Sequence, residues 1–442
     1  MRRAFFSVLL VVACGGGTTT PATTAHVEPL ATASASSTSS VTPPLAPASD
    51  DKHAVFAPDP AGPFVTTPRS LPAPAGPRGI VQLLGTIGRM CVLNASGEIA
   101  CIQSGNTPWT REPVTDATYM AMENDLICAV KKSGEVACWG SVNEAWGFHR
   151  TPTNVPKITG AIRTSVATAS ACMLGRDGRV GCVGMDSGLG AGPLGKDRSF
   201  DPVEPLGLSD VIDLFSNRFE ACARERAGAV KCWGVAEHGT LGPFGETPNG
   251  PVELVGIRGA IDVSIAQQYA CAVLSDGGVA CWGDHYGKND DDPKGAYDFQ
   301  RIWGVNDAVS VIAGVQATCI LRKTGNVVCL GYGHEGHLGD GVGDRPRWGV
   351  TDDTVIPVYP EDVDTRAAGG PNPPKRLRKR PPGARSTKLM NVVGLGDAVA
   401  IAEYGYGLCA LKKTGALACW GTHLPGTKID QSNVAREVPR PP

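Results

Sequence analysis

Fourteen of the 15 cysteines in this chain fall into pairs with one constant spacing. The two members of every pair are ten positions apart, and only Cys14 is left over. The pairs are Cys91 with Cys101, Cys128 with Cys138, Cys172 with Cys182, Cys222 with Cys232, Cys271 with Cys281, Cys319 with Cys329, and Cys409 with Cys419. Unrelated segments would not keep one spacing seven times, so the chain must contain seven copies of one local structure.

A glycine stands six positions after the first cysteine in every copy. These glycines are Gly97, Gly134, Gly178, Gly228, Gly277, Gly325 and Gly415. If the two cysteines face each other across antiparallel strands, a three-residue loop puts this glycine at the last loop position. The backbone there is left-handed, in a type I turn followed by a G1 bulge, and glycine adopts it without steric cost. Each copy is therefore predicted to be a β-hairpin.

Cross-strand disulfides follow from this hairpin. The cysteines fall on a non-hydrogen-bonded rung, where Cα atoms approach to about 4.5 Å, which disulfide geometry accepts. A zinc site is disfavoured, because structural zinc cysteines usually stand two to four positions apart. Each disulfide would stabilise its own hairpin by about 2–3 kcal/mol in the chain-entropy account. Packing between copies must hold one hairpin to the next.

The N-terminus resembles an export signal. Basic residues precede an apolar run from Ala4 to Ala13, which is too short to span a bilayer as a helix. The following "VVAC" resembles the bacterial lipobox, so residues 1–13 are predicted as a lipoprotein signal peptide and Cys14 as the lipidation site. The alternative is an ordinary signal peptide that is cleaved elsewhere. Export to an oxidising compartment also agrees with disulfide formation.

Residues 14–76 are dominated by Thr, Pro, Ala and Ser. Such a segment has too little apolar surface to offset the entropy lost on ordering, so we expect a disordered tether. The lipid at its start would anchor the protein to a membrane, since two lipid signals already give stable anchoring. The predicted location is the cell envelope, at the outer membrane or cell surface.

The repeat extends beyond the hairpin. A short apolar segment precedes each cysteine pair, and Trp-Gly follows it at Trp139, Trp233, Trp282 and Trp420. The middle copies are 44 to 50 residues long. Several short strands per unit at this period indicate a β-propeller blade, and a closed ring leaves no long unpaired edge. Residues 77–442 are therefore predicted as an all-β, seven-bladed β-propeller, with the Trp side chains packed between blades.

These repeats resemble a known family. "CALKKTGALACWG" (409–421) and "GHEGHLGDG" (333–341) resemble the regulator of chromosome condensation (BNR-like) repeat family, in its extracellular bacterial, cysteine-paired form. The resemblance covers about 77–442 and implies a seven-bladed propeller. Arg224 stands where the repeat expects an apolar residue, so we expect looser packing of the fourth blade. We expect the ring to close where the tail "REVPRPP" meets the first strand, near 79–84.

One segment interrupts the repeat. The last two copies begin 90 positions apart, and the excess lies around 365–388, which Pro, Gly and charged residues mark as an exposed loop insertion. The insertion contains a basic run of Lys375, Arg376, Arg378, Lys379 and Arg380. The run could contact a polyanion such as phosphorylated glycan. The simpler interpretation, a solvated surface loop, is favoured.

No metal, cofactor or catalytic site is predicted. The acidic segment 288–295 lacks the alternating ligand spacing of a calcium loop. His285, His334, His337 and His423 lack a third ligand that the sequence can place. No nucleophile elbow, Cys-His dyad, P-loop or glycosidase pair stands out from the repeat.

The expected function is binding. The formal net charge of −2 argues against a nucleic-acid binder that acts through its overall field, and no specific nucleic acid is expected. Variable loops on a constant frame favour a non-catalytic, envelope-anchored scaffold that presents these loops to a protein or glycan partner. We expect this scaffold to be a monomer. The alternative is a glycan-acting hydrolase or lyase whose site is built from loops on one face of the ring.

Overall fold

The computed structural model describes the repeat region of the chain, with gaps. The described residues are 79–103, 107–140, 150–168, 170–185, 188–192, 198–217, 220–235, 240–241, 250–266, 269–283, 299–314, 317–332, 334–342 and 385–441. The predicted signal peptide, the tether with Cys14, and the basic run Lys375 to Arg380 lie outside them. Residues 385–388, predicted as the end of the loop insertion, belong to a strand.

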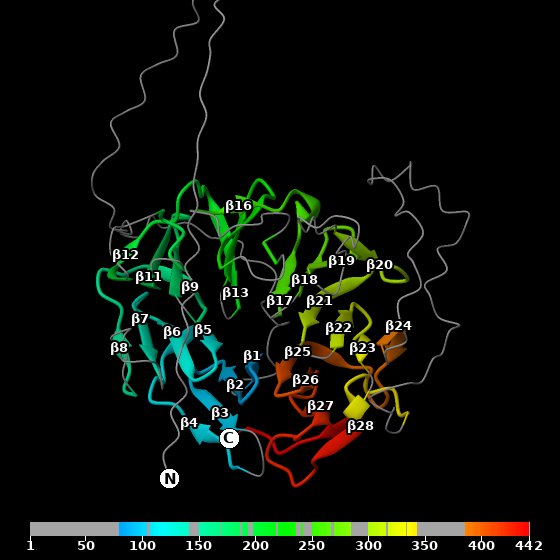
Figure 1. The fold of residues 1–442 in the computed structure, drawn as a ribbon. Coiled ribbons are helices and arrows are strands. Elements are labelled where there is room, and N and C mark those ends of the chain that lie inside the picture. The colour runs from blue at the N-terminus through cyan, green and yellow to red at the C-terminus, as the bar shows by residue number, and fades with distance from the viewer. Residues whose placement is uncertain are drawn as a thin grey trace, which may run out of the picture. The chain divides into compact units, whose positions relative to one another are not determined.

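The described strands form seven four-stranded antiparallel sheets, which are the blades of a β-propeller (Figure 1). Blades 1 to 3 contain β1 (Ile80–Gly85), β2 (Arg89–Asn94), β3 (Ile99–Gln103) and β4 (Thr110–Arg111); β5 (Ala117–Glu123), β6 (Leu126–Lys131), β7 (Val136–Trp139) and β8 (Thr153–Asn154); and β9 (Ala161–Val166), β10 (Ser170–Gly175), β11 (Val180–Met185) and β12 (Arg198–Val203). Blades 4 and 5 contain β13 (Val211–Ser216), β14 (Glu220–Glu225), β15 (Val230–Gly234) and β16 (Val252–Glu253); and β17 (Asp262–Ile265), β18 (Tyr269–Val273), β19 (Val279–Gly283) and β20 (Gln300–Ile302).

Blades 6 and 7 contain β21 (Ala308–Ala313), β22 (Ala317–Arg322), β23 (Val327–Tyr332) and β24 (Arg385–Asn391); and β25 (Ala398–Tyr404), β26 (Gly407–Lys412), β27 (Leu417–Thr422) and β28 (Gln431–Glu437). Two short 3-10 helices, η3 (Val255–Ile257) and η4 (His334–Gly336), lie between strands. The first strand of each blade is nearest the centre of the ring (Figure 1). Within the described ranges, no helix is long and apolar enough to cross a bilayer.

The cysteine hairpin has the predicted geometry. In blade 2, Cys128 lies opposite Cys138, and Gly134 has a φ of +81°. The Gly134 N–H donates to the Lys131 carbonyl at 2.9 Å, which closes the turn. The second strand of each blade thus lies beside the third with the two cysteines in register.

All seven predicted disulfides form, with Cα–Cα distances of 4.0 to 4.1 Å. In blade order they join Cys91 to Cys101, Cys128 to Cys138, Cys172 to Cys182, Cys222 to Cys232, Cys271 to Cys281, Cys319 to Cys329, and Cys409 to Cys419. The predicted fold, with one cross-strand disulfide in each blade, is confirmed.

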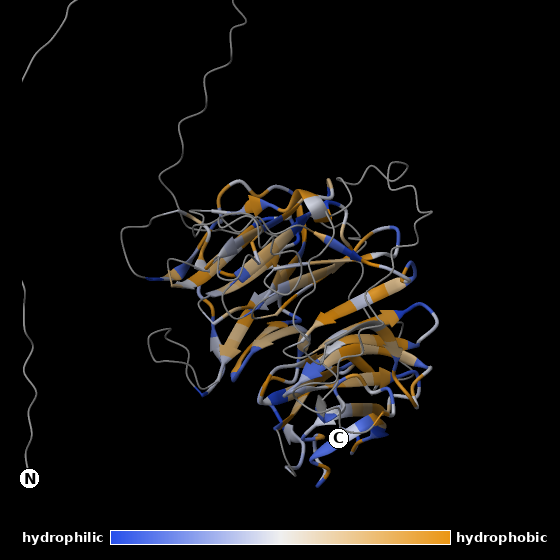
Figure 2. Ribbon diagram, turned by 45° about the vertical axis from the view of Figure 1, so that its right-hand side comes forward, coloured by the Kyte–Doolittle hydropathy of each residue, from blue (hydrophilic) through white to orange (hydrophobic). Residues whose placement is uncertain are grey.

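Packing between blades forms the core. Buried apolar residues fall into seven clusters, and each cluster lies between two neighbouring blades. Figure 2 shows the strands mainly in hydrophobic colours and many of the turns in hydrophilic ones. Because burial lies between blades and each disulfide lies within one, the disulfides stabilise the units and apolar packing holds the ring together.

The ring closes by side-chain packing between blades 7 and 1. The tail strand β28 pairs with β27 inside blade 7, so the tail does not extend the sheet that contains β1. Val438 joins the apolar cluster that contains Leu83 of β1. The Trp109 indole N–H donates to the Pro439 carbonyl at 3.0 Å. The tail therefore meets the first blade as predicted, but through packing and a hydrogen bond rather than strand pairing.

Candidate functional site

A central channel lies between the innermost strands of the described blades. It has a volume of about 540 Å³ and is lined by residues of all seven innermost strands. Glu123 and Glu403 lie where β5 and β25 end, at one mouth. Lys323 and Lys413 lie in the turns after β22 and β26, at the other mouth. The two mouths thus differ in charge, which gives the channel an acidic and a basic end.

Polar contacts join neighbouring blades along the channel wall. They involve the ninth residue before the first cysteine of each pair, which we call the channel position. It is occupied by Gln82, Tyr119, Arg163, Asp213, Asp262, Ser310 and Ala400. The Gln82 side chain accepts from the Met120 N–H at 3.0 Å and donates to its carbonyl at 2.8 Å. Asp262 accepts from the Ser310 hydroxyl at 2.8 Å and from the Val311 N–H at 3.1 Å. These contacts run from one blade to the next.

Three charged side chains meet at the channel positions of blades 3 and 4. The fully buried Asp213 carboxylate lies 3.3 Å from the Arg224 guanidinium across the same sheet, and 3.5 Å from Arg163 of the preceding blade. The Arg163 guanidinium also lies 4.9 Å from the Tyr119 ring centroid of blade 2. Arg224 is therefore buried beside a counter-ion, at a position where the repeat expects an apolar residue. Its partner Asp213 is identified only when β13 and β14 are paired in register.

The Trp side chains bind each blade to the loop of the preceding blade. The indole N–H groups of Trp233, Trp282 and Trp420 donate to the carbonyls of Gly188, Thr240 and His337, at 3.0, 2.7 and 3.1 Å. All three rings are buried. The leucine of each preceding loop (Leu189, Leu241 and Leu338) is buried as well. The predicted packing of Trp between blades is confirmed, and these rings are not available to stack on a glycan.

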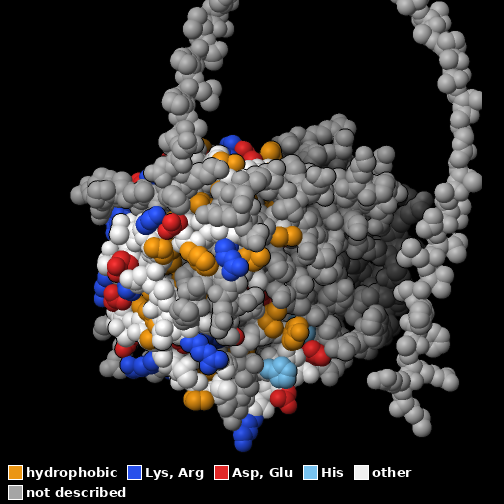
Figure 3. All heavy atoms as spheres, turned by 60° about the vertical axis from the view of Figure 1, so that its left-hand side comes forward, with side chains coloured by type: hydrophobic (Ala, Val, Ile, Leu, Met, Phe, Trp, Pro, Cys, Tyr) orange, Lys and Arg blue, Asp and Glu red, His pale blue; other side chains and the backbone are white. Residues whose placement is uncertain are grey.

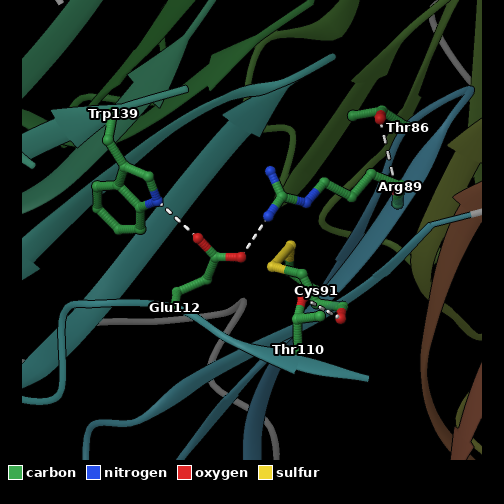
Figure 4. The surroundings of a disulfide bond; sticks show 7 residues. Thr86, Arg89, Cys91, Thr110, Glu112 and Trp139 are labelled. Carbon is green, nitrogen blue, oxygen red and sulfur yellow. Dashed lines mark hydrogen bonds and ion pairs between the residues drawn. A yellow bond between two sulfur atoms is a disulfide. The ribbon is translucent and has the colours of Figure 1, made fainter. Parts of the chain in front are cut away.

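In blade 2 the Trp indole N–H donates to a side-chain carboxylate instead of a backbone carbonyl. Trp139 donates its indole N–H to the Glu112 carboxylate at 2.7 Å, and Glu112 also forms an ion pair with Arg89. Figure 4 shows Glu112 between Trp139 and Arg89, near the disulfide of Cys91. Glu112 is thus a structural residue of the first blade interface.

Metal-binding chemistry is not assembled in the described ranges. No group of three or more His, Cys, Asp or Glu side chains there is close enough to hold an ion. His337 is buried in the loop that receives Trp420, whereas His423 is exposed. His285 and the acidic segment 288–295 lie outside the described residues, as does the His334 side chain.

Asp276 and Tyr404 have a shifted pKa. The Arg301 guanidinium, which donates a hydrogen bond to the Asp276 carboxylate, lowers the pKa of Asp276. Burial raises the pKa of Tyr404. Neither group lines the central channel. The shifts therefore belong to a surface ion pair and a buried ring, and they do not mark an acid–base pair in the channel.

Solved structures with the same architecture include RCC1 proteins, although no protein-family model and no curated protein matches this chain. Prp20p from Saccharomyces cerevisiae, described with its binding to Gsp1p and histones, is 15% identical, with a TM-score of 0.52 over 74% of this chain and 76% of that chain. Yeast RCC1 (Prp20) bound to Kap60 is 13% identical, with a TM-score of 0.56 over 87% and 91%. Human WBSCR16 is 18% identical, with a TM-score of 0.55 over 75% and 84%.

At such low identities, these structural similarities establish the fold but not the function. Each comparison covers most of both chains, so the similarity extends around the ring rather than to one blade. The repeat phrases in the sequence and the three superpositions agree on the same architecture. This chain is a seven-bladed β-propeller with a disulfide in every blade, and its fold is similar to that of solved RCC1 structures.

Proposed function

We propose that this protein is an exported, lipid-anchored scaffold that binds a protein partner without catalysis. The proposal rests on the positions of the cysteines, the Trp rings and the buried charged side chains of the propeller. In the described ranges the propeller cysteines form disulfides, and the Trp rings and the cluster of Arg163, Asp213 and Arg224 lie at blade interfaces. The result is a rigid frame whose variable surface is available for recognition.

The comparisons support a protein partner by analogy. The yeast propeller Prp20p is described with its binding to Gsp1p and histones, and yeast RCC1 is found bound to Kap60. A disulfide in every blade is typical of proteins from oxidising compartments. A lipid on Cys14, followed by a flexible tether at 14–76, would keep the propeller at the envelope and leave its surface accessible.

The binding proposal is tested with the full-length, detergent-extracted protein. We expect one or a few envelope proteins of its own cells to co-purify in a fixed ratio, and to be absent when an unrelated lipoprotein is the bait. If nothing co-purifies reproducibly, the scaffold proposal is wrong.

Anchoring has a separate test at Cys14. In cells grown with labelled palmitate, the parent protein should carry label and sediment with membranes. The Cys14→Ser variant should lose both the label and the sedimentation. An unlabelled parent protein would show that the signal peptide is of the ordinary kind.

A second candidate is a hydrolase or lyase that acts on glycans. The observation that favours it is the presence of two carboxylates, Glu123 and Glu403, at one mouth of the channel, since glycosidases use paired carboxylates. Turnover on a panel of envelope glycans that disappears in Glu123→Gln and Glu403→Gln would support it. Absence of turnover across the panel would leave the scaffold as the function.

A further inference from the structure

The segments that link successive blades expose apolar side chains at one repeated position. This is the sixteenth residue before the first cysteine, which we call the link position. Between blades 3 and 7 the links read "PLGL" (205–208), "LVGI" (254–257), "IWGV" (302–305) and "VVGL" (392–395). The second residue of each is exposed: Leu206 by 54%, Val255 by 73%, Trp303 by 39% and Val393 by 47%. We call these four residues the apolar arc.

The exposure is a property of the link rather than of apolar residues in general. The neighbouring apolar residues of the same links face inward; Leu254 and Ile257, on either side of Val255, are 2% and 0% exposed. A glycine follows each arc residue, and Gly207, Gly304 and Gly394 have positive φ. The chain therefore turns sharply at the link position and directs that side chain to solvent.

The arc covers only part of the ring. At the two earlier links that the structure describes, the same position holds Glu112, which binds Trp139 and Arg89, and Pro156. Eight large hydrophobic residues are exposed in the described ranges, and four of them are the arc. Single exposed apolar residues are common, but here four recur at one position of four successive links.

Additional apolar surface adjoins the end of the arc. Gly341, in the loop between β23 and β24, lies against Val393 and Val434, and the next residue, Val342, is 46% exposed. The Ala435 N–H of β28 donates to the Val393 carbonyl at 3.0 Å, so this region is held by backbone hydrogen bonds. The surface around Val393 is therefore preformed, which lowers the entropy cost of binding.

The charges beside the arc indicate the chemistry of its partner. The residue two before each of the first three arc members is charged, and each forms an ion pair within its own blade: Glu204 with Arg179, Glu253 with Arg258, and Arg301 with Asp276. Charges of both signs also lie side by side on the side of β8 and β12, which Figure 3 brings forward. Because these charges are balanced locally, the arc does not select an anionic bilayer or a nucleic acid, both of which require excess Lys and Arg.

We propose that the apolar arc is the docking surface for a protein partner that presents an apolar, largely uncharged contact region. The inference rests on the proposed scaffold function and assigns partner binding to the apolar arc. The centres of interfaces are more apolar than the rest of a protein surface and are depleted in charged residues, which agrees with exposed Leu, Val and Trp side chains whose charged neighbours are held in ion pairs. Trp303 would be the main anchor, since Trp is the residue most often critical at such centres.

The experiment compares the arc with equally exposed apolar residues outside the links. Met185 and Tyr406 are 46% and 47% exposed. They lie at the end of β11 and in the turn after β25, outside the links that carry the arc. The arc variant carries Leu206→Gln, Val255→Thr, Trp303→Gln and Val393→Thr. The control variant carries Met185→Gln and Tyr406→Gln.

Both variants are made in the full-length protein and must keep the parent melting temperature and all seven disulfides. The amount of partner protein that co-purifies with the arc variant should be lower than with the parent by a factor of about ten or more. The control variant should retain the parent amount. A photo-crosslinking residue at each arc position should capture the same partner, and one at Met185 or Tyr406 should not. Should the arc variant misfold, single Val255→Thr and Val393→Thr variants repeat the comparison.

The outcomes distinguish a failure of the arc proposal from a failure of the scaffold proposal. If the parent retains partners and the arc variant retains them equally, the arc proposal is wrong and the scaffold proposal stands. If the parent retains nothing, the scaffold proposal fails. Crosslinks from the arc to a second copy of this chain, or arc-dependent sedimentation with phosphatidylglycerol–phosphatidylcholine vesicles, would each overturn the assignment to a different protein.

Discussion

Asp213 shows how a single side chain can connect three blades. Its carboxylate lies between Arg224 of its own sheet and Arg163 of the preceding blade, and Arg163 lies beside Tyr119 of blade 2. Buried ion pairs contribute little net stability, because desolvation offsets much of the attraction. Removing the Asp213 carboxylate is costly, however, since two buried guanidinium groups then lose its negative charge.

We predict that Asp213→Ala lowers the free energy of unfolding by about 3–5 kcal/mol. Arg224→Leu should cost much less, because leucine occupies the same repeat position in four other blades, at Leu93, Leu174, Leu321 and Leu411. Chemical denaturation of both variants makes the comparison. Equal losses would show that the cluster does not depend on its single carboxylate.

Tyr404 allows a second test at the residue scale. Its ring is 1% exposed, and its hydroxyl has no hydrogen-bond partner in the described part of the chain. We expect Tyr404→Phe to be neutral or to stabilise the protein by up to about 1–3 kcal/mol, because it removes a buried, unsatisfied polar group.

The same variant predicts a pH dependence. Burial raises the pKa of Tyr404 above its ordinary value of 10.0, so the folded state holds the proton more tightly than the unfolded state. The parent protein should therefore lose stability as the pH rises above about 10, while the variant lacks this contribution. Denaturation curves at pH 8 to 11 would show the difference growing with pH. Parallel curves would contradict the assignment.

At the scale of the element, the hairpin turn combines backbone conformation with close packing. Gly134 and Gly415 occupy the same repeat position with φ of +81° and +78°. A Cβ atom at Gly134 would lie 2.7 Å from the Gly160 backbone nitrogen, whereas one at Gly415 would meet nothing within 4 Å. The turn sets a left-handed backbone at both sites, and only at Gly134 does the neighbouring link also exclude a side chain.

We expect Gly415→Ala to cost about 1–2 kcal/mol, from the left-handed backbone alone. Gly134→Ala should cost clearly more, because the methyl group also displaces the link at Gly160. Thermal or chemical denaturation of the two variants measures the difference. Similar losses would mean that the link moves aside without cost.

At the scale of the whole molecule, two kinds of interaction act at two levels. The disulfides connect strands inside each blade, and apolar clusters with Trp hydrogen bonds connect one blade to the next. In such a repeat ring, each unit contacts mainly its neighbours, and stability is approximately the sum of unit and interface terms.

This arrangement predicts the redox behaviour of the mature protein. The propeller cysteines are at most 1% exposed, so alkylating reagents should not modify them without reductant. After denaturation and reduction, mass spectrometry should show a gain of fourteen hydrogens, from the seven disulfides. Peptide maps should link only cysteines ten positions apart. A disulfide between blades would contradict the structure.

Much of the propeller could be predicted because its signals are local. A constant spacing between cysteines and a glycine at one place specify a hairpin through interactions within about a dozen residues, and seven hairpins at a blade-like period specify the ring. The ion pair of Arg224 could not be predicted, because its partner, Asp213, is identified only when the strands of its blade are paired in register. Strand pairing of the tail could not be predicted for the same reason.

The sequence by itself therefore determined the seven hairpins, their disulfides and the propeller class, because each depends on neighbouring residues. Only the tertiary structure decided which residues meet between blades, such as Trp420 with the His337 carbonyl, 83 positions away. It also decided that Val255 is exposed while Leu254 and Ile257 beside it are buried. Apolar residues look alike in a sequence, and their burial depends on surfaces that come together only when the ring closes.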